Sequence, residues 1–271
     1  MTAPPLFSVI VPAHNAADTL AQTVDSVLAQ SLPDWELLIY DDASTDGTAE
    51  ILRGYDADPR ITVLRGAENR GAGVARAALL ARARGRYAAF LDSDDVWLPE
   101  RLERVARALE ASAADILCTD MRRIDSRGRP AERKRPARRL TRWTHLARNP
   151  FLTSASCVRL DLAGAREMPD LRARQDYAYW LGLIRRNPGL RYRYLPEALT
   201  LYRRRPGSLS SSPGRNLVNN YRAFRVSGYG PGLSAAALGP HVAARAWRFA
   251  TGAAAQLGSR IGGRPGGRKG S

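Results

Sequence analysis

The sequence has no long apolar run, few cysteines and almost no lysine, and the first of these shortages argues against a membrane-spanning helix. No stretch approaches the roughly 18 consecutive apolar residues that a transmembrane helix needs. Residues 1–5 are neither basic nor followed by an apolar signal region with a cleavage site. From these absences we expect a cytoplasmic protein.

Cysteine occurs only as Cys118 and Cys157, which are far apart in the sequence. Two isolated cysteines supply neither a disulfide framework nor a structural zinc site. Because Cys118 lies in an apolar run, we predict reduced thiols that are buried in strands.

Lysine occurs only at positions 134 and 269, so arginine carries nearly all of the basic charge, and the formal net charge is +16. Two explanations stay open, namely an anionic partner such as an acidic membrane surface and the composition of a GC-rich genome. The chain shows no metal finger, aromatic RNA-binding motif or basic zipper, so we expect no nucleic-acid partner.

Strands and helices alternate over the first 120 residues, which predicts an α/β fold with a mostly parallel sheet. A chain of 271 residues suits one large domain with a small appendage. Periodicity predicts strands over residues 7–11, 35–40, 61–64, 87–91 and 115–119. It predicts helices that begin at the N-cap Asn15 and that cover 48–55, 71–84 and about 99–109, with Pro99 in the first turn.

The pattern loosens after residue 121. Residues 122–139 are basic and hold two prolines, which predicts a mobile loop. We expect a helix over 176–184, a short strand within 195–202 and helical pieces within 213–250. From residue 252 the chain is rich in glycine and arginine, which is typical of disorder.

Three carboxylates, Asp92, Asp94 and Asp95, directly follow the apolar run 87–91. Such a group at the end of a buried strand is costly unless a cation or several donors lie among its members. Carboxylate oxygens suit Mg or Mn, and a metal with few protein ligands keeps positions for phosphate oxygens. One Asp is enough to cap a helix, so three favour a metal that carries a nucleotide diphosphate.

Polar residues also follow the other predicted strands. His14, Asp41, Asp42 and Asn69 come after the first three. Ligands of open α/β sheets bind beyond the carboxyl ends of the strands. We therefore expect these side chains and the three carboxylates to converge on one crevice.

Taken together, the motifs resemble those of family 2 glycosyltransferases with the GT-A fold, especially enzymes of bacterial cell-surface polysaccharide and teichuronic-acid assembly. They cover roughly residues 7–210 in the family's order and spacing. The matching segments are Ser8–Asn15, Asp41–Thr48, Glu68–Gly71, Asp92–Asp95, Arg174–Trp180 and Tyr202–Ser208. The resemblance implies a Rossmann-like, mostly parallel sheet with helices on both faces and a less regular acceptor region.

The same resemblance implies a division of the chain. Residues 1–210 would form the glycosyltransferase domain, with a nucleotide-sugar-binding half (1–120) and an acceptor-binding half (121–210). Residues 211–251 would form a helical extension, and residues 252–271 a disordered basic tail.

The resemblance also assigns site residues. Asp94 and Asp95 match the ligands of a divalent metal, Mn or Mg, with Asp92 supporting the turn. Asp42 matches the residue that contacts the uracil and ribose, and Arg203 and Ser208 fall in a loop that can close over the diphosphate. The donor-binding set is Pro12, His14, Asn15, Asp42, Asn69, Arg76, Asp92, Asp94 and Arg203.

Several of these assignments have plain alternatives. His14 could be a loop histidine without a role, Arg76 a solvated helix residue, and Arg203–Arg205 a solvated run. The chain departs from the family at Ala77, where relatives commonly carry Asn, and a polar contact near the donor is therefore in doubt.

Asp176 matches the position of the family's catalytic base. Inverting transfer needs a carboxylate that removes the proton of the attacking acceptor hydroxyl. Gln175 stands where many relatives have Glu. The alternative is that Asp176 caps the helix that runs toward Trp180.

The implied activity is inverting transfer from a nucleotide-sugar, most simply a UDP-sugar, to a saccharide or a polyprenyl-diphosphate-linked acceptor. The protein would dock on the inner face of the cell membrane through loop 122–139 and the segment around Arg245, Trp247 and Arg248. A nucleotidyltransferase would need a Gly-rich loop after the first strand, which residues 12–15 do not form. A non-catalytic basic scaffold or nucleic-acid-binding protein would not need carboxylates at positions 42, 94, 95 and 176.

Overall fold

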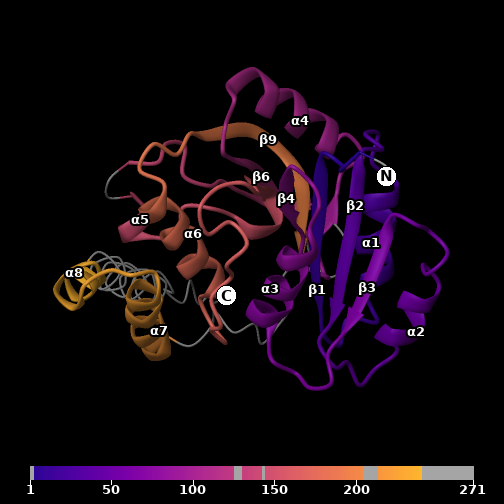
Figure 1. Cartoon of the computed structure of the whole chain (residues 1–271), viewed down its shortest axis with the longest axis horizontal. Helices are drawn as coiled ribbons and strands as arrows, with labels where there is room; N and C mark the ends of the chain where they lie inside the picture. Colours follow the sequence, from indigo (N-terminus) through magenta and orange to yellow (C-terminus); the bar gives the residue numbers. More distant parts are fainter. Residues whose placement is uncertain (1–2, 125–129, 142–143, 204–212, 240–271) are drawn as a thin grey trace, which may run out of the picture.

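The computed structural model describes residues 3–124, 130–141, 144–203 and 213–239, except for the side chains of 130–131 and 213–216 (Figure 1). One mixed sheet forms the centre, in the order β3-β2-β1-β4-β8-β6-β9-β5, and β7 pairs with β6 outside this path. The strands are β1 (Phe7–Ala13), β2 (Trp35–Asp41), β3 (Ile61–Arg65), β4 (Tyr87–Phe90), β5 (Val96–Trp97), β6 (Ile116–Ile124), β7 (Pro130–Lys134), β8 (Ser156–Arg159) and β9 (Tyr192–Arg203). The helices are α1 (Leu20–Leu28), α2 (Thr48–Arg53), α3 (Ala72–Arg82), α4 (Arg101–Ser112), α5 (Thr144–Ala147), α6 (Gln175–Arg186), α7 (Pro213–Val226) and α8 (Pro231–Ala236).

The first half of the sheet is parallel and the second half is mixed. β1 pairs in parallel with both β2 and β4, and β2 with β3. β8 runs antiparallel to β4 and β6, whereas β9 runs parallel to β6. The predicted α/β fold is confirmed, and the polar residues after β1, β2 and β4 leave the sheet at the same edge.

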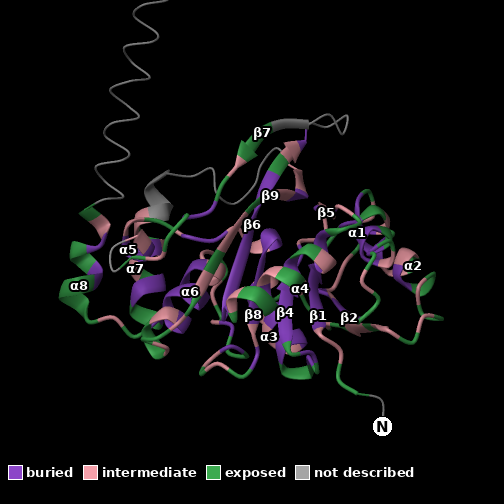
Figure 2. Cartoon of the chain, turned by 90° about the horizontal axis from the view of Figure 1, so that it is seen from above, coloured by how far each residue is buried: buried purple, intermediate pink, exposed green. Residues whose placement is uncertain are grey.

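Helices cover both faces of the sheet because the side chains of its strands alternate in direction. Val9 and Val11 of β1 pack in a core with residues of α1, α2 and α4. Ile10 packs on the other face with residues of α3 and α6, including Leu79 and Trp180. Figure 2 accordingly shows the central strands as buried. A third, smaller cluster joins α5, α6, α7 and the residues directly after α8 around Phe224.

Two predicted helix starts are wrong. α1 begins at Leu20 after the cap residue Thr19, and not after Asn15. Asn15 has a left-handed φ of 46°, which Asn tolerates, and its side chain bonds the backbone of Thr45 instead of its own helix. α4 begins at Arg101, two residues beyond Pro99.

The loop predicted for residues 122–139 is wrong for residues 122–124 and 130–134, which lie in strands, whereas residues 135–139 belong to no helix or strand. β6 continues to Ile124 and pairs antiparallel with β7. Asp120, buried in β6, binds Arg133 of β7 and accepts a hydrogen bond from Tyr194 of β9 at 2.8 Å. This anchoring also explains why β9 is longer than the short strand that we predicted within 195–202.

The carboxyl-terminal predictions are tested in part. α7 and α8 lie within the expected helical extension (211–251). Residues 240–251 and the basic tail 252–271 lie outside the described residues, and the division into domains stays a prediction. Cys118 and Cys157 are free and buried, as predicted, and burial raises the pKa of Cys118 to about 11 and that of Cys157 to about 12.

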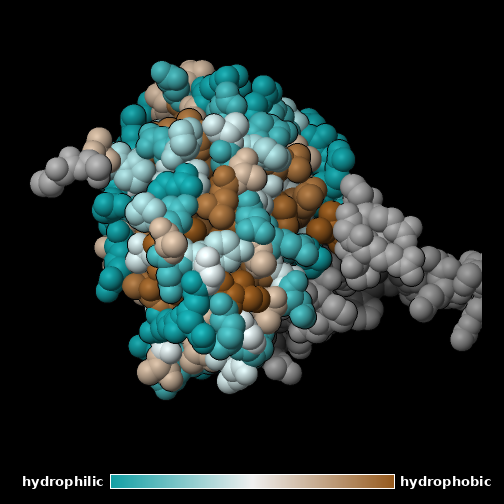
Figure 3. All heavy atoms as spheres, turned by 90° about the vertical axis from the view of Figure 1, so that its right-hand side faces the viewer, coloured by the Kyte–Doolittle hydropathy of each residue, from teal (hydrophilic) through white to brown (hydrophobic). Residues whose placement is uncertain are grey.

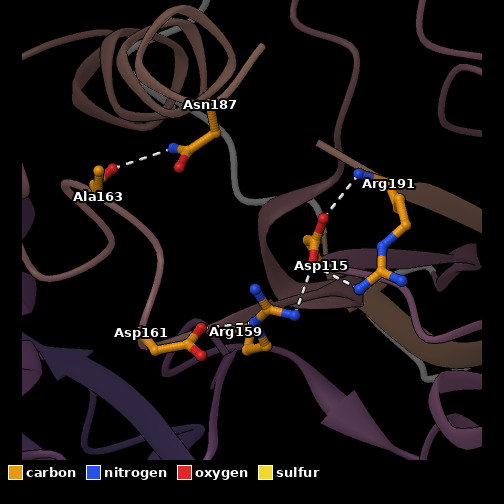
Figure 4. Close-up of polar contacts among 6 residues, drawn as sticks. All are labelled: Asp115, Arg159, Asp161, Ala163, Asn187 and Arg191. Carbon is orange, nitrogen blue, oxygen red and sulfur yellow. Dashed lines mark hydrogen bonds and ion pairs between the residues drawn. The ribbon is translucent and has the colours of Figure 1, made fainter. Parts of the chain in front are cut away.

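An ion-pair network fixes the opposite, amino-terminal edge of the parallel strands. The buried carboxylate of Asp115 accepts from the guanidinium of Arg159 at 2.8 Å and from the backbone N–H of Arg191 at 2.8 Å (Figure 4). These contacts join the starts of β6 and β9 to the end of β8. A pocket of about 380 Å³ opens beside them, lined in part by Leu6, Tyr87 and the same two arginines. Because Asp115 already pairs with both arginines, we assign this pocket a structural role.

A buried carboxylate in β2 makes the stability depend on pH. Burial alone would raise the pKa of Glu36, but hydrogen bonds from Ser8 and from the backbone and guanidinium of Arg84 outweigh it and lower the pKa below 4.5. A lowered pKa adds stability above the unfolded value, and this is lost as the pH falls through the folded value.

We therefore expect Glu36→Gln to lower the free energy of unfolding by about 1–3 kcal/mol at pH 7. The difference from the parent should shrink as the pH falls below 4.5. Urea titrations at pH 7 and at pH 3.5 measure both effects. A difference that is equal at the two values would contradict the assignment.

Candidate active site

Hydrogen bonds join the loop that follows β1 to the loop that follows β2. Nδ1 of the exposed His14 lies 2.8 Å from the carbonyl oxygen of Asp42, and the backbone N–H of Asp42 donates to Ala13 at 2.8 Å. The amide oxygen of Asn15 accepts from the backbone N–H of Thr45 at 2.9 Å. Pro12 is buried in β1 opposite Tyr40. The structure therefore brings Pro12, His14, Asn15 and Asp42 together.

Asp42 also forms hydrogen bonds with the loop that precedes α3. Its carboxylate accepts from the backbone N–H groups of Arg70 at 2.9 Å and of Gly71 at 2.7 Å. Gly71 has a φ of 91° and a ψ of 162°, a conformation that only glycine adopts easily. Beside it, Asn69 accepts from the guanidinium of Arg172. Asp42 thus shapes this loop with both of its oxygens.

Arg76 is not a solvated helix residue. Its side chain is buried on α3, and one Nη donates to the carboxylate of Asp92. The other two guanidinium nitrogens are buried and have no hydrogen-bond partner among the described residues. The alternative reading of Arg76 is therefore wrong.

The carboxylates after β4 differ in exposure. Asp92 and Asp94 are half-buried, whereas Asp95 is fully buried. Oδ1 of Asp95 accepts from the backbone N–H of Arg203 at 3.0 Å, and its Oδ2 has no partner among the described residues. Burial, together with the nearby charges of Asp92 and Asp94, raises the pKa of Asp95 well above its usual value.

Arg203, at the end of β9, contacts the carboxylate cluster. Its Nε donates to the carbonyl oxygen of Asp94 at 3.2 Å, and its Nη2 donates to Gln22 at 2.8 Å. The end of β9 therefore packs on the carboxylate cluster. Arg204, Arg205 and Ser208 lie outside the described residues.

Asp176 is not the cap residue of α6. The cap position of α6 belongs to Arg174, and Asp176 lies in the first turn. Its Oδ2 accepts from Nδ2 of Asn149 at 2.9 Å and from the hydroxyl of Thr153 at 3.4 Å. Asp176 is thus held from outside its own helix, by the segment that precedes β8.

That segment, residues 149–154, also reaches the carboxylate cluster. The hydroxyl of Ser154 accepts from the backbone N–H of Asp92 at 3.2 Å. Neighbouring residues Thr153 and Ser154 therefore touch Asp176 on one side and the cluster on the other. The sequence analysis missed this segment, although short polar residues directly before a strand were a usable signal.

The described residues gather no set of three or more His, Cys, Asp or Glu side chains that could hold a metal. A metal site at the carboxylate cluster would therefore have to take ligands from a bound molecule as well as from the protein. In the same described part of the chain, no helix is long and apolar enough to cross a membrane.

Comparison with known proteins decides the family. Residues 8–167 match the family model for glycosyl transferase family 2. The chain belongs to this family. It is 37% identical to TuaG of Bacillus subtilis, described as a teichuronic acid biosynthesis glycosyltransferase, over 82% of this chain and 88% of TuaG. It is 29% identical to the UDP-Glc:α-D-GlcNAc-diphosphoundecaprenol β-1,3-glucosyltransferase WfaP of Escherichia coli, over 82% of this chain and 87% of WfaP.

Solved structures confirm the fold. TarS 1–349 of S. aureus, in complex with UDP-GlcNAc, superposes with a TM-score of 0.69 at 23% identity, and the match covers 88% of this chain and 72% of the solved 1–349 chain. The mannosyltransferase PcManGT of Pyrobaculum calidifontis, solved with GDP-Man and Mn²⁺, gives a TM-score of 0.59 at 19% identity over 94% of this chain and 81% of PcManGT. The chain is a glycosyltransferase. The alternative predictions, a nucleotidyltransferase and a non-catalytic scaffold, are therefore wrong.

Proposed function

We propose that this glycosyltransferase moves a sugar from a UDP-sugar, with inversion, to a polyprenyl-diphosphate-linked saccharide in surface polysaccharide assembly. The observation that carries the proposal is the 149–154 segment, since it holds a half-buried carboxylate, Asp176, next to the cluster of Asp92, Asp94 and Asp95. The UDP-sugar donor is proposed because WfaP is named as using UDP-Glc and TarS was solved with UDP-GlcNAc. The lipid-linked acceptor is proposed because WfaP is named as acting on GlcNAc-diphosphoundecaprenol.

In this mechanism Asp176 acts on the acceptor. Its carboxylate removes the proton of the acceptor hydroxyl as that oxygen forms a bond with the anomeric carbon. The bond from that carbon to the diphosphate oxygen breaks, and its electron pair leaves with UDP. Attack from the face opposite UDP inverts the anomeric centre.

On the donor side, buried Arg76 has two guanidinium nitrogens without a partner among the described residues, and these nitrogens can bind an anion. Arg203 stands at the cluster and can offset charge on the departing diphosphate. His14, Asn15, Asp42 and Asn69 would surround the uridine.

The carboxylate cluster fits a divalent cation. Asp95 has a buried oxygen that no described residue bonds, and the charges of Asp92 and Asp94 lie close to it. We assign Asp94 and Asp95 as the protein ligands of Mn or Mg. When bound, the metal would stabilise the negative charge of the leaving diphosphate.

The direct test is a screen of UDP-, GDP- and dTDP-sugars with Mn present, first for binding and then for transfer to GlcNAc-diphosphoundecaprenol. We expect UDP-sugars to bind and one of them to be transferred. Exclusive binding of a GDP- or dTDP-sugar would overturn the choice of donor.

Two segments are predicted to dock on the membrane. Residues 122–139 are described in part, and Arg122, Arg135 and Arg138 are exposed there, whereas Arg245, Trp247 and Arg248 lie outside the described residues. A further exposed surface lies on α7 and α8. In the described part, the exposed large apolar side chains are Val218, Val226 and Leu233, all on α7 and α8. Val218 and Val226 lie eight residues apart on one face of α7, with the exposed Arg222 between them. The face of the molecule in Figure 3, in contrast, shows apolar side chains only in small separate patches.

We therefore expect α7 and α8 to dock on an anionic bilayer. The protein should sediment with phosphatidylglycerol vesicles, and binding should weaken as salt screens the charge. Val218→Ser with Arg222→Ser should lower the binding constant about fivefold or more, whereas Arg107→Ser, on α4, should matter little. Equal binding to phosphatidylcholine vesicles, or none to either, would favour the compositional explanation of the charge.

A further inference from the structure

The two oxygens of Asp176 have different surroundings. Oδ2 accepts from Asn149 at 2.9 Å and from Thr153 at 3.4 Å. No described residue bonds Oδ1. The side chain is half-buried, so a group that enters the site can reach this oxygen.

The amide of Asn149 is itself fixed in orientation. Its Oδ1 accepts from the backbone N–H of Phe151 at 3.2 Å, so its Nδ2 must face Asp176. An amide turned the other way would bring its oxygen toward the carboxylate and lose both hydrogen bonds.

Phe151 connects this contact back to α6. Its ring lies in the core, with its centroid 4.8 Å from that of Trp180 and 5.2 Å from that of Tyr192. Trp180 stands one turn along α6 from Asp176. The path from Asp176 through Asn149, Phe151 and Trp180 therefore returns to the helix that carries the carboxylate.

We propose that Asn149 and Thr153 are positioning residues that hold Oδ2 of Asp176 and leave Oδ1 for the proton of the acceptor hydroxyl. The inference rests on the proposed role of Asp176 as the base. A carboxylate held by two donors keeps one rotamer before the acceptor arrives, and proton transfer depends on such geometry. Neither residue touches the reacting atoms in this account.

The test compares side chains that do or do not keep the donor. Asn149→Ala should lower kcat by about 10- to 100-fold, because one charge-assisted hydrogen bond is lost. The KM for the UDP-sugar and the Kd for UDP should stay within about twofold of the parent values. Thr153→Val should also lower kcat, whereas Thr153→Ser, which keeps the hydroxyl, should restore it to within about threefold.

Asn187→Ala is the matched control. Asn187 lies at the other end of α6, and its Nδ2 donates to the carbonyl of Ala163 (Figure 4). We expect this variant to keep the parental kcat. Thermal unfolding of each variant shows whether the fold is retained.

Three outcomes distinguish the positioning roles of Asn149 and Thr153 from the role of Asp176 as the base. A parental kcat in Asn149→Ala, or a raised KM with kcat unchanged, would overturn the positioning role. Loss of kcat in Thr153→Val that Thr153→Ser does not restore would do the same for Thr153. If Asp176→Asn itself kept full transfer, the proposed base would fail and the positioning role with it.

Discussion

Asp176→Asn should keep the fold and bind a UDP-sugar with near-parental affinity, yet lose about 10²–10⁴-fold in kcat. The reason is that an amide cannot take the proton of the acceptor hydroxyl. Its oxygen can still accept from Asn149, so the first turn of α6 should keep its contact with the 149–154 segment. A group that acts only in the transition state lowers turnover without weakening ground-state binding.

Gln175→Ala is the control for this prediction. It changes the neighbouring residue of α6, but Gln175 is no base, so the loss should be far smaller. Single-turnover transfer and UDP-sugar titrations, measured on both variants, separate chemistry from binding. Near-parental transfer by Asp176→Asn would leave the mechanism without a base.

Asp94→Asn with Asp95→Asn should abolish the Mn-dependent part of UDP binding and weaken it by about tenfold or more, because two anionic ligands are lost. Asn at position 95 can still accept from the backbone N–H of Arg203, so the contact between β9 and the cluster should survive. Calorimetric titrations of UDP with Mn and with EDTA give both affinities.

Asp161→Asn is the matched control for charge. Asp161 is exposed and pairs with Arg159 at the opposite edge of the sheet (Figure 4). This variant should bind UDP as the parent does. If the double variant also bound UDP and Mn as tightly as the parent, the metal assignment would be wrong.

The sequence predicted the parallel half of the fold because local signals agree there. β1, β2 and β4 are short apolar runs, and a turn or a polar residue follows each. Their parallel pairing places the residues after them at one edge, so the sequence alone groups His14, Asp42 and Asp92. The family motifs come from the same segments.

Elsewhere, long-range contacts decide the structure. Whether residues 122–134 form a loop or a strand depends on the pairing of Arg133 with Asp120, which no local pattern shows. The start of α1 depends on Asn15, whose side chain bonds the loop after β2. Asn149 and Thr153 become candidate site residues only because α6 places Asp176 within hydrogen-bond distance of both.

The configuration of the transferred sugar distinguishes inverting from retaining transfer at this site. UDP-α-glucose, or whichever UDP-α-sugar the screen selects, is transferred in Mn buffer, and ¹H NMR of the product reports the new anomeric linkage. A single displacement assisted by one base, Asp176, predicts a β-linked product. An α-linked product, with the donor configuration retained, would contradict the direct inverting transfer proposed for this site.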